Sequence, residues 1–116
     1  MAAERGPSEA IDPELLALQT LGDRGLEADL FELFDAQATR LWPVIAGGTD
    51  RGARAEAAHT LRGGAGAIGA TEVMRLAGAL EAVFGRDGEE PSQLLASLAT
   101  ALTDVRSAIA SWCRSN

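Results

Sequence analysis

The 116-residue sequence has no tyrosine, one cysteine and one histidine, and only 4% of its residues are aromatic. A single cysteine cannot form an intramolecular disulfide, and Cys113 together with one histidine cannot supply the ligands of a metal cluster. We therefore expect no metal site and no cofactor in this chain. The expected role of Cys113 is that of a small apolar residue on the last helix.

The chain also lacks long apolar runs and any excess of basic residues. It has no stretch of about 18 uncharged apolar residues, and no basic segment followed by an apolar one at its start. The net charge is −7, and residues 1–35 carry nine acidic side chains against two basic ones. These absences argue against a membrane span, a signal peptide and nucleic-acid binding, and they predict a cytoplasmic protein.

The residues that are present favour helices. Hydrophobic residues make up 47% of the chain, with alanine and leucine dominant and β-branched residues few. At this length one domain is expected. We expect residues 1–10 to be a flexible tail and residues 11–116 to form a helical bundle domain. The tail and the Met1 start favour a free-standing protein over a fragment of a larger one.

Apolar spacing and capping residues predict five helices. The first is short, with Asp12 as its cap and Pro13 at its first position, and it ends near residue 22. The others are expected at about 26–46, 49–68, 71–84 and 92–112, with Thr71 capping the fourth. Because the connections are short, we expect an all-α antiparallel four-helix bundle with a short additional N-terminal helix.

The second and fifth helices each carry an apolar stripe that should face the core. On the second helix, Pro43 should kink or loosen the last turn. The stripe of the second helix comprises Leu30, Leu33, Phe34, Leu41 and Ile45, and that of the fifth comprises Leu95, Leu98, Leu102, Val105, Ile109 and Trp112.

His59 lies in a helix with an unusual number of glycines. Glycine inside a helix costs about 1 kcal/mol relative to alanine, so repeated glycine there indicates that bare backbone is needed for close approach. The core face of this helix comprises Ala58, Leu61, Ala65 and Ile68. His59 lies roughly 140° from the centre of that face and should point outward, with Arg62 on its near flank.

An outward imidazole on a helix can act as a base, a metal ligand or a nucleophile. A metal ligand would need a second histidine, and a general base would need a concave substrate pocket, which a smooth convex helix face does not offer. These constraints favour a nucleophile that is offered to a macromolecular partner, whose own surface supplies the rest of the site.

The residues around His59 resemble the signature of histidine-containing phosphotransfer (HPt) domains, in which alanine-histidine is followed by leucine, a cationic residue, glycine and further small residues. The matching segment is Ala58-His59-Thr60-Leu61-Arg62-Gly63-Gly64-Ala65-Gly66-Ala67-Ile68-Gly69-Ala70. Leu76-Ala77 and Leu80-Glu81 also match the family's following helix. The chain departs from the family at Arg62, where lysine is usual, and at Gly64 and Ala67, where serine and asparagine are common.

The resemblance implies a two-component phosphorelay carrier without enzymatic activity. His59 would accept a phosphoryl group on Nε2 from a receiver-domain aspartate and pass it to another receiver, while Arg62 steadies the phosphoryl oxygens. The partners would be response-regulator receivers, which bring the Mg²⁺ ion, and could include a hybrid histidine kinase. Glu56 is placed to orient the imidazole. The receiver docking surface would comprise Gly52, Ala55, Gly63 and Gly66.

Two other classes of function stay open. The chain could be an adaptor that binds signalling domains without chemistry, or a structural bundle that dimerises over residues 52–66 and carries an incidental histidine. An adaptor would gain no acid-labile phosphate, and an obligate dimer would show its size in light scattering, whereas the phosphorelay carrier is expected to be a monomer. The sequence does not identify the cognate receivers or the direction of phosphoryl flow.

Overall fold

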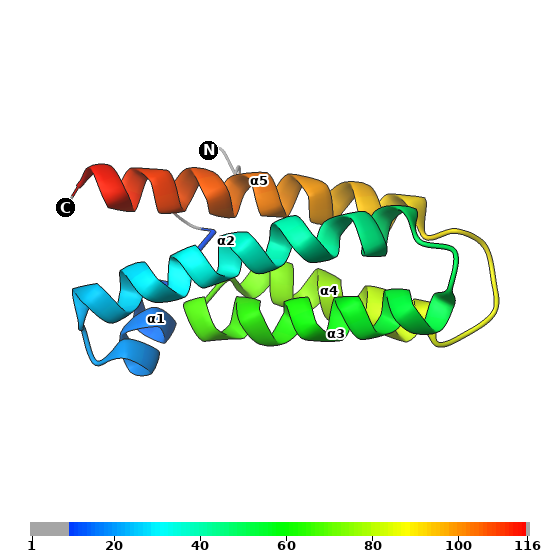
Figure 1. The fold of residues 1–116 in the computed structure, drawn as a ribbon, viewed down its shortest axis with the longest axis horizontal. Coiled ribbons are helices and arrows are strands. Elements are labelled where there is room, and N and C mark those ends of the chain that lie inside the picture. The colour runs from blue at the N-terminus through cyan, green and yellow to red at the C-terminus, as the bar shows by residue number, and fades with distance from the viewer. Residues whose placement is uncertain (1–9, 116) are drawn as a thin grey trace, which may run out of the picture.

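The computed structural model describes residues 10–115, which are all-helical and contain no strand, as expected. The helices are α1 (Pro13–Thr20), α2 (Arg24–Gly47), α3 (Arg51–Ile68), α4 (Thr71–Phe84) and α5 (Ser92–Arg114). The four long helices lie side by side along the long axis, and α1 lies at one end of α3 (Figure 1). The expected tail falls mostly outside the described residues, but Ala10 is within them and is buried.

Aspartates cap the N-termini of the first three helices. Asp12, Asp23 and Asp50 each accept hydrogen bonds from backbone N–H groups of the following turn, which otherwise have no partner within the helix. The prediction that Thr71 caps α4 is wrong: Thr71 is the first helical residue, and Ala70 precedes it without a side-chain cap. Pro43 lies inside α2, which continues to Gly47.

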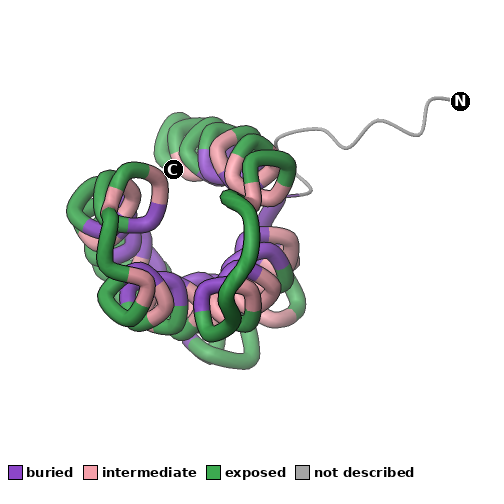
Figure 2. Tube along the Cα trace, turned by 90° about the vertical axis from the view of Figure 1, so that its right-hand side faces the viewer, coloured by how far each residue is buried: buried purple, intermediate pink, exposed green. Residues whose placement is uncertain are grey.

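Buried residues line the inward sides of the long helices (Figure 2). The predicted core face of α3 is confirmed, because Ala58, Leu61, Ala65 and Ile68 are all fully buried. The prediction for Leu33 is wrong, since 63% of this residue is exposed. The face of α2 that is actually buried is defined by Phe31, Phe34, Ala38, Leu41 and Ile45, and Leu33 lies about 100° from Phe34 around the helix.

The predicted inward stripe of α5 is buried at its centre and only partly buried at its ends. Leu98, Leu102 and Val105 belong to the core, while Leu95, Ile109 and Trp112 are half-buried against it. Trp112 packs edge-on against Phe31 of α2, with ring centroids 4.9 Å apart. Cys113, by contrast, is exposed. None of the helices formed by residues 10–115 is long and apolar enough to cross a membrane.

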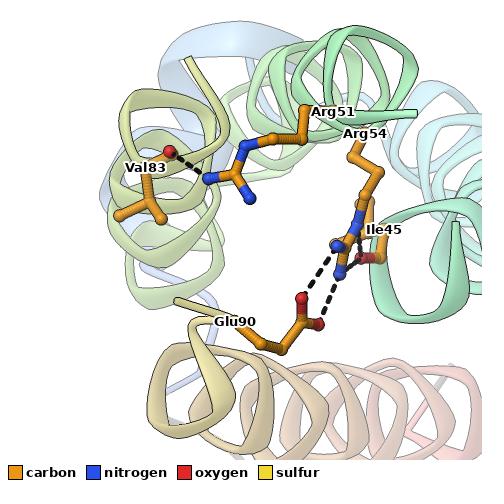
Figure 3. A network of polar contacts seen from close by, with 5 residues as sticks. All are labelled: Ile45, Arg51, Arg54, Val83 and Glu90. Atoms are coloured by element: carbon orange, nitrogen blue, oxygen red, sulfur yellow. Dashed lines mark hydrogen bonds and ion pairs between the residues drawn. The ribbon is translucent and has the colours of Figure 1, made fainter. Parts of the chain in front are cut away.

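Two arginines at the start of α3 satisfy the carbonyl groups at the ends of its neighbours (Figure 3). Arg54 donates from Nε and Nη2 to the Ile45 carbonyl in the last turn of α2, and it pairs through both Nη atoms with Glu90 before α5. Arg51 donates to the Val83 carbonyl of α4. Carbonyls in the last turn of a helix have no partner within the helix, so these bonds tie four helix ends together.

The α1 end of the bundle is fixed through Gly69. This residue ends α3 with a φ of 75°, in the left-handed region that favours glycine. Its carbonyl accepts a hydrogen bond from the Asp12 N–H at 2.8 Å. A Cβ at this position would lie 2.8 Å from the Asp12 carbonyl oxygen. Glycine is therefore required here both for the backbone conformation and for the close approach of α1.

Candidate functional site

His59 lies near the middle of α3 with its side chain 60% exposed. The preceding residue, Ala58, is fully buried, and so is Leu61 one turn later. The imidazole therefore projects from the outer surface of a helix whose inner face is anchored in the core. This outcome matches the outward orientation predicted from the helical wheel.

The Nδ1 atom of the ring is held by a carboxylate. Glu81 of α4 places Oε2 at 3.0 Å from Nδ1. Because an ionised carboxylate can only accept a hydrogen bond, this contact requires the proton to be on Nδ1. In the neutral ring the lone pair is then on Nε2, the nitrogen with no hydrogen-bond partner among residues 10–115.

Arg62 lies on the same side of the ring. Its Nη2 is 3.2 Å from His59 Nδ1 and 3.6 Å from Glu81 Oε1. A guanidinium only donates, so it cannot hydrogen-bond Nδ1 while that nitrogen carries the proton shared with Glu81. In this tautomer Arg62 is instead paired electrostatically with Glu81. Its side chain is 43% exposed, which leaves the cation close to the ring and accessible to an approaching anion.

Glu56, the expected orienting residue, is exposed and does not contact the ring in the described part of the chain. The reason is the direction in which the ring leans. Residues three before and three after His59 lie about 60° to its opposite sides, and the ring leans toward Arg62 and α4. Glu81 takes the expected role, although it was predicted only as a match to the family's following helix. Helical spacing cannot pair His59 with a residue 22 positions later on another helix.

The four small residues of the expected docking surface differ in their surroundings. Gly63 is exposed, and a Cβ there would meet nothing within 4 Å. Gly52 is exposed as well. Gly66 faces α4 instead, since a Cβ there would lie 3.3 Å from Met74 Sδ, and Ala55 is partly buried against the core. Only Gly63 therefore combines exposure with open space, since a Cβ on Gly52 would lie 3.3 Å from Asp50 Oδ1.

Gly64 has a structural role that the sequence did not indicate. A Cβ at this position would overlap the side-chain amide of Gln37 on α2. The glycine leaves room for the Gln37 side chain between α2 and α3. Leu33, one turn before Gln37, is exposed.

Three cavities of similar volume lie away from His59. One of about 320 Å³ is bounded by Trp42 and Leu102, one of about 350 Å³ by Phe31 and Trp112, and one of about 330 Å³ by Glu72 and Asp104. None of the three is lined by His59 or its contacts. An exposed ring outside these cavities suits a macromolecular partner better than a small substrate.

Comparison with protein families gives one match. The family model described as Hpt domain matches residues 26–108, a segment that contains His59, Arg62 and Glu81. No curated protein and no solved structure matched the chain.

Proposed function

Because this chain belongs to the Hpt domain family, we propose that it is a histidine phosphotransfer protein of a two-component phosphorelay. His59 accepts a phosphoryl group from the phospho-aspartate of one receiver domain and donates it to another. The observation that carries this proposal is the exposed ring whose Nδ1 contacts Glu81 at 3.0 Å, which directs the lone pair of Nε2 outward.

The proposed transfer is an in-line displacement. The Nε2 lone pair attacks phosphorus, an Nε2–P bond forms, and the P–O bond to the receiver's aspartate breaks, so that the aspartate leaves as a carboxylate. Positive charge develops on the imidazole, and Glu81 stabilises it through the Nδ1 proton. Arg62 lies close enough to the ring to give up its ion pair with Glu81 and contact the phosphoryl oxygens instead. We expect the receiver to bring the Mg²⁺ ion, since phosphoryl transfer requires mainly positioning and charge neutralisation.

In this proposal the chain is a stoichiometric carrier. The sequence has no glycine-rich loop ending in lysine and serine or threonine, so it offers no ATP site of that kind. The phosphoryl group must therefore come from a partner. The direct test is to mix the protein with a phosphorylated receiver and follow the label. Transfer of an acid-labile, base-stable phosphate supports the carrier, whereas a complex without transfer would identify an adaptor.

We expect the receiver to dock over α3 and the adjoining part of α2. Gly63 provides open surface on α3, and Leu33 is exposed on α2, one turn before the Gln37 side chain that lies beside Gly64. Two exposed acidic residues, Asp29 and Glu32, flank Leu33 on α2, whereas Asp35 pairs with Arg106 of α5. A complementary receiver surface should therefore have an apolar centre with basic residues around it, because charge complementarity steers association and excludes unsuitable partners.

Substitution of Gly63 tests this docking surface. Gly63→Trp should slow transfer from a phosphorylated receiver by roughly tenfold or more, because a bulky side chain separates the two surfaces at a site where small misplacements are costly. Gly63→Ala is the matched control: its Cβ meets nothing, and it should raise helix stability by about 1 kcal/mol. Stopped-flow or gel-based transfer rates and thermal melts measure both. If Gly63→Trp transfers phosphate as fast as the wild type, Gly63 does not lie in the interface.

Substitution of Glu81 tests the orientation of the ring. Glu81→Ala should lower the rate of phosphoryl acceptance by roughly tenfold, in the range seen when a residue that orients a histidine is removed. Two-bond ¹H–¹⁵N NMR of the imidazole should show a proton on Nδ1 in the wild type and a mixture of tautomers in the variant. Glu72→Ala, which changes another glutamate of α4, is the control. If Glu81→Ala keeps both the tautomer and the rate, Glu81 does not orient His59.

A further inference from the structure

Three pairs of residues show which positions of α3 and α4 face each other beside the site. A Cβ on Gly66 would contact Met74, a Cβ on Gly78 would contact Arg62, and His59 contacts Glu81. From one pair to the next, the residue number on α3 falls by four and then by three. The residue number on α4 rises by four and then by three, so each set lies along one face of its helix. Gly78 is the middle α4 member, one turn before Glu81.

Gly78 occupies a position where glycine has no conformational justification. It lies inside α4, and it is not among the glycines with positive φ in the described part of the chain. Glycine is the least favourable residue in a helix interior apart from proline. Its presence at position 78 therefore needs another explanation, and close approach by a neighbouring group is the usual one.

That neighbouring group is Arg62. A Cβ built on Gly78 would lie 3.4 Å from Arg62 Cδ and 3.7 Å from Arg62 Nη1, and no other side chain or distant backbone atom comes within 4 Å. The stem of Arg62 thus crosses α4 over bare backbone, and its guanidinium ends 3.6 Å from Glu81 and 3.2 Å from the ring of His59. Packing of the two helix backbones does not explain the glycine, because the contact is with the arginine side chain.

We propose that Gly78 is a positioning residue for phosphoryl transfer: it leaves the space in which Arg62 lies, and so keeps the guanidinium beside His59. This inference rests on the proposed function for its kinetic consequence, but the position of Arg62 can be measured without any transfer. It also accounts for the arginine at position 62, because a long side chain that lies across α4 needs a partner position carrying no more than a methyl group.

A double-mutant cycle tests the proposal. Gly78→Leu should slow phosphoryl acceptance by roughly 100-fold, the low end of the loss seen when one preorganised donor is removed, and to about the same rate as Arg62→Met. The double variant should be no slower than Arg62→Met alone, because both changes remove the same interaction. Gly78→Ala is the matched control: its 3.4 Å contact is ordinary packing, so its rate should stay within about twofold of wild type. Multiplicative effects of the two substitutions would overturn the inference.

NMR relaxation of the Arg62 Nε–H group gives a second readout in the unphosphorylated protein. Arg62 should be ordered in the wild type and Gly78→Ala, and mobile in Gly78→Leu; an ordered Arg62 in Gly78→Leu would contradict the proposal. Gly78→Gln, with a flexible side chain at this half-buried position, replaces Gly78→Leu if the latter does not fold. If the wild type never accepts phosphate, the proposed function fails, while the relaxation data still decide the role of Gly78.

Discussion

Replacement of His59 by glutamine is expected to abolish phosphoryl labelling completely while leaving the fold unchanged. Glutamine keeps a polar side chain of similar reach but has no nucleophilic nitrogen. The His59 side chain is 60% exposed, and the two side chains beside its ring, Glu81 and Arg62, are 32% and 43% exposed. Exposed substitutions of this kind usually change stability by no more than about 0.5 kcal/mol.

The measurement combines transfer from a phosphorylated receiver with a denaturant or thermal melt of the same variant. Glu56→Gln is the matched control, because this residue is exposed on the same helix and does not contact the ring. It should label normally. Residual acid-labile phosphate on His59→Gln would place the acceptor elsewhere, and a loss of more than about 2 kcal/mol in stability would mean that the ring supports the core.

Replacement of Arg54 by methionine is expected to cost about 2–3 kcal/mol of stability without changing the chemistry at His59. Arg54 is 4% exposed, satisfies the Ile45 carbonyl with two hydrogen bonds and lies 4.3 Å over the ring of Phe84. Methionine retains much of the packing but leaves that buried carbonyl without its donor. The cost stays below that of breaking a fully buried ion pair, because the Glu90 side chain is 48% exposed and can be hydrated.

Chemical denaturation measures this loss, and Arg75→Met is the control. Arg75 also forms a two-bond pair with a glutamate, Glu72, but its side chain is 64% exposed, so its loss should matter far less. A loss for Arg54→Met no larger than that for Arg75→Met would show that the Arg54 network does not hold the helix ends together.

The Arg54 network also predicts a pH dependence. The hydrogen bonds from Arg54 lower the pKa of Glu90 in the folded protein below the ordinary value of 4.5. The carboxylate therefore stabilises the fold fully above that ordinary value, and the stabilisation is lost as the pH falls through the lowered folded-state pKa. The stability difference between wild type and Glu90→Gln should shrink over this acidic range.

The sequence was sufficient to predict the inner and outer faces of α3. Its buried residues follow one helical stripe, and no neighbouring helix alters that geometry, so Ala58 and Leu61 are buried and His59 is exposed as expected. The start of α1 followed from the Asp12 cap in the same way, whereas the Asp23 cap of α2 was not predicted. These features depend on residues close together in the chain, for which local rules are reliable.

The sequence could not predict which neighbours the exposed side chains contact. Leu33 is apolar and lies close to the buried stripe of α2, but its exposure depends on the position of the adjacent helices. Glu81 reaches His59 only because α3 and α4 pack in a particular register. The glycines illustrate the same limit: Gly63 is open, Gly64 accommodates Gln37, and Gly78 accommodates Arg62. Glycines close to the site thus differ in their surroundings, and only the packing of the helices distinguishes them.

The most direct test of the account is to locate the phosphoryl group. Wild-type protein should be incubated with a phosphorylated receiver and Mg²⁺, separated from the receiver, and examined by ³¹P NMR and by mass spectrometry under neutral conditions. The account predicts one phosphoramidate, bonded to Nε2 of His59. A phosphoryl group on Nδ1 or on any other residue, or no transfer from any of a panel of receivers, would contradict it.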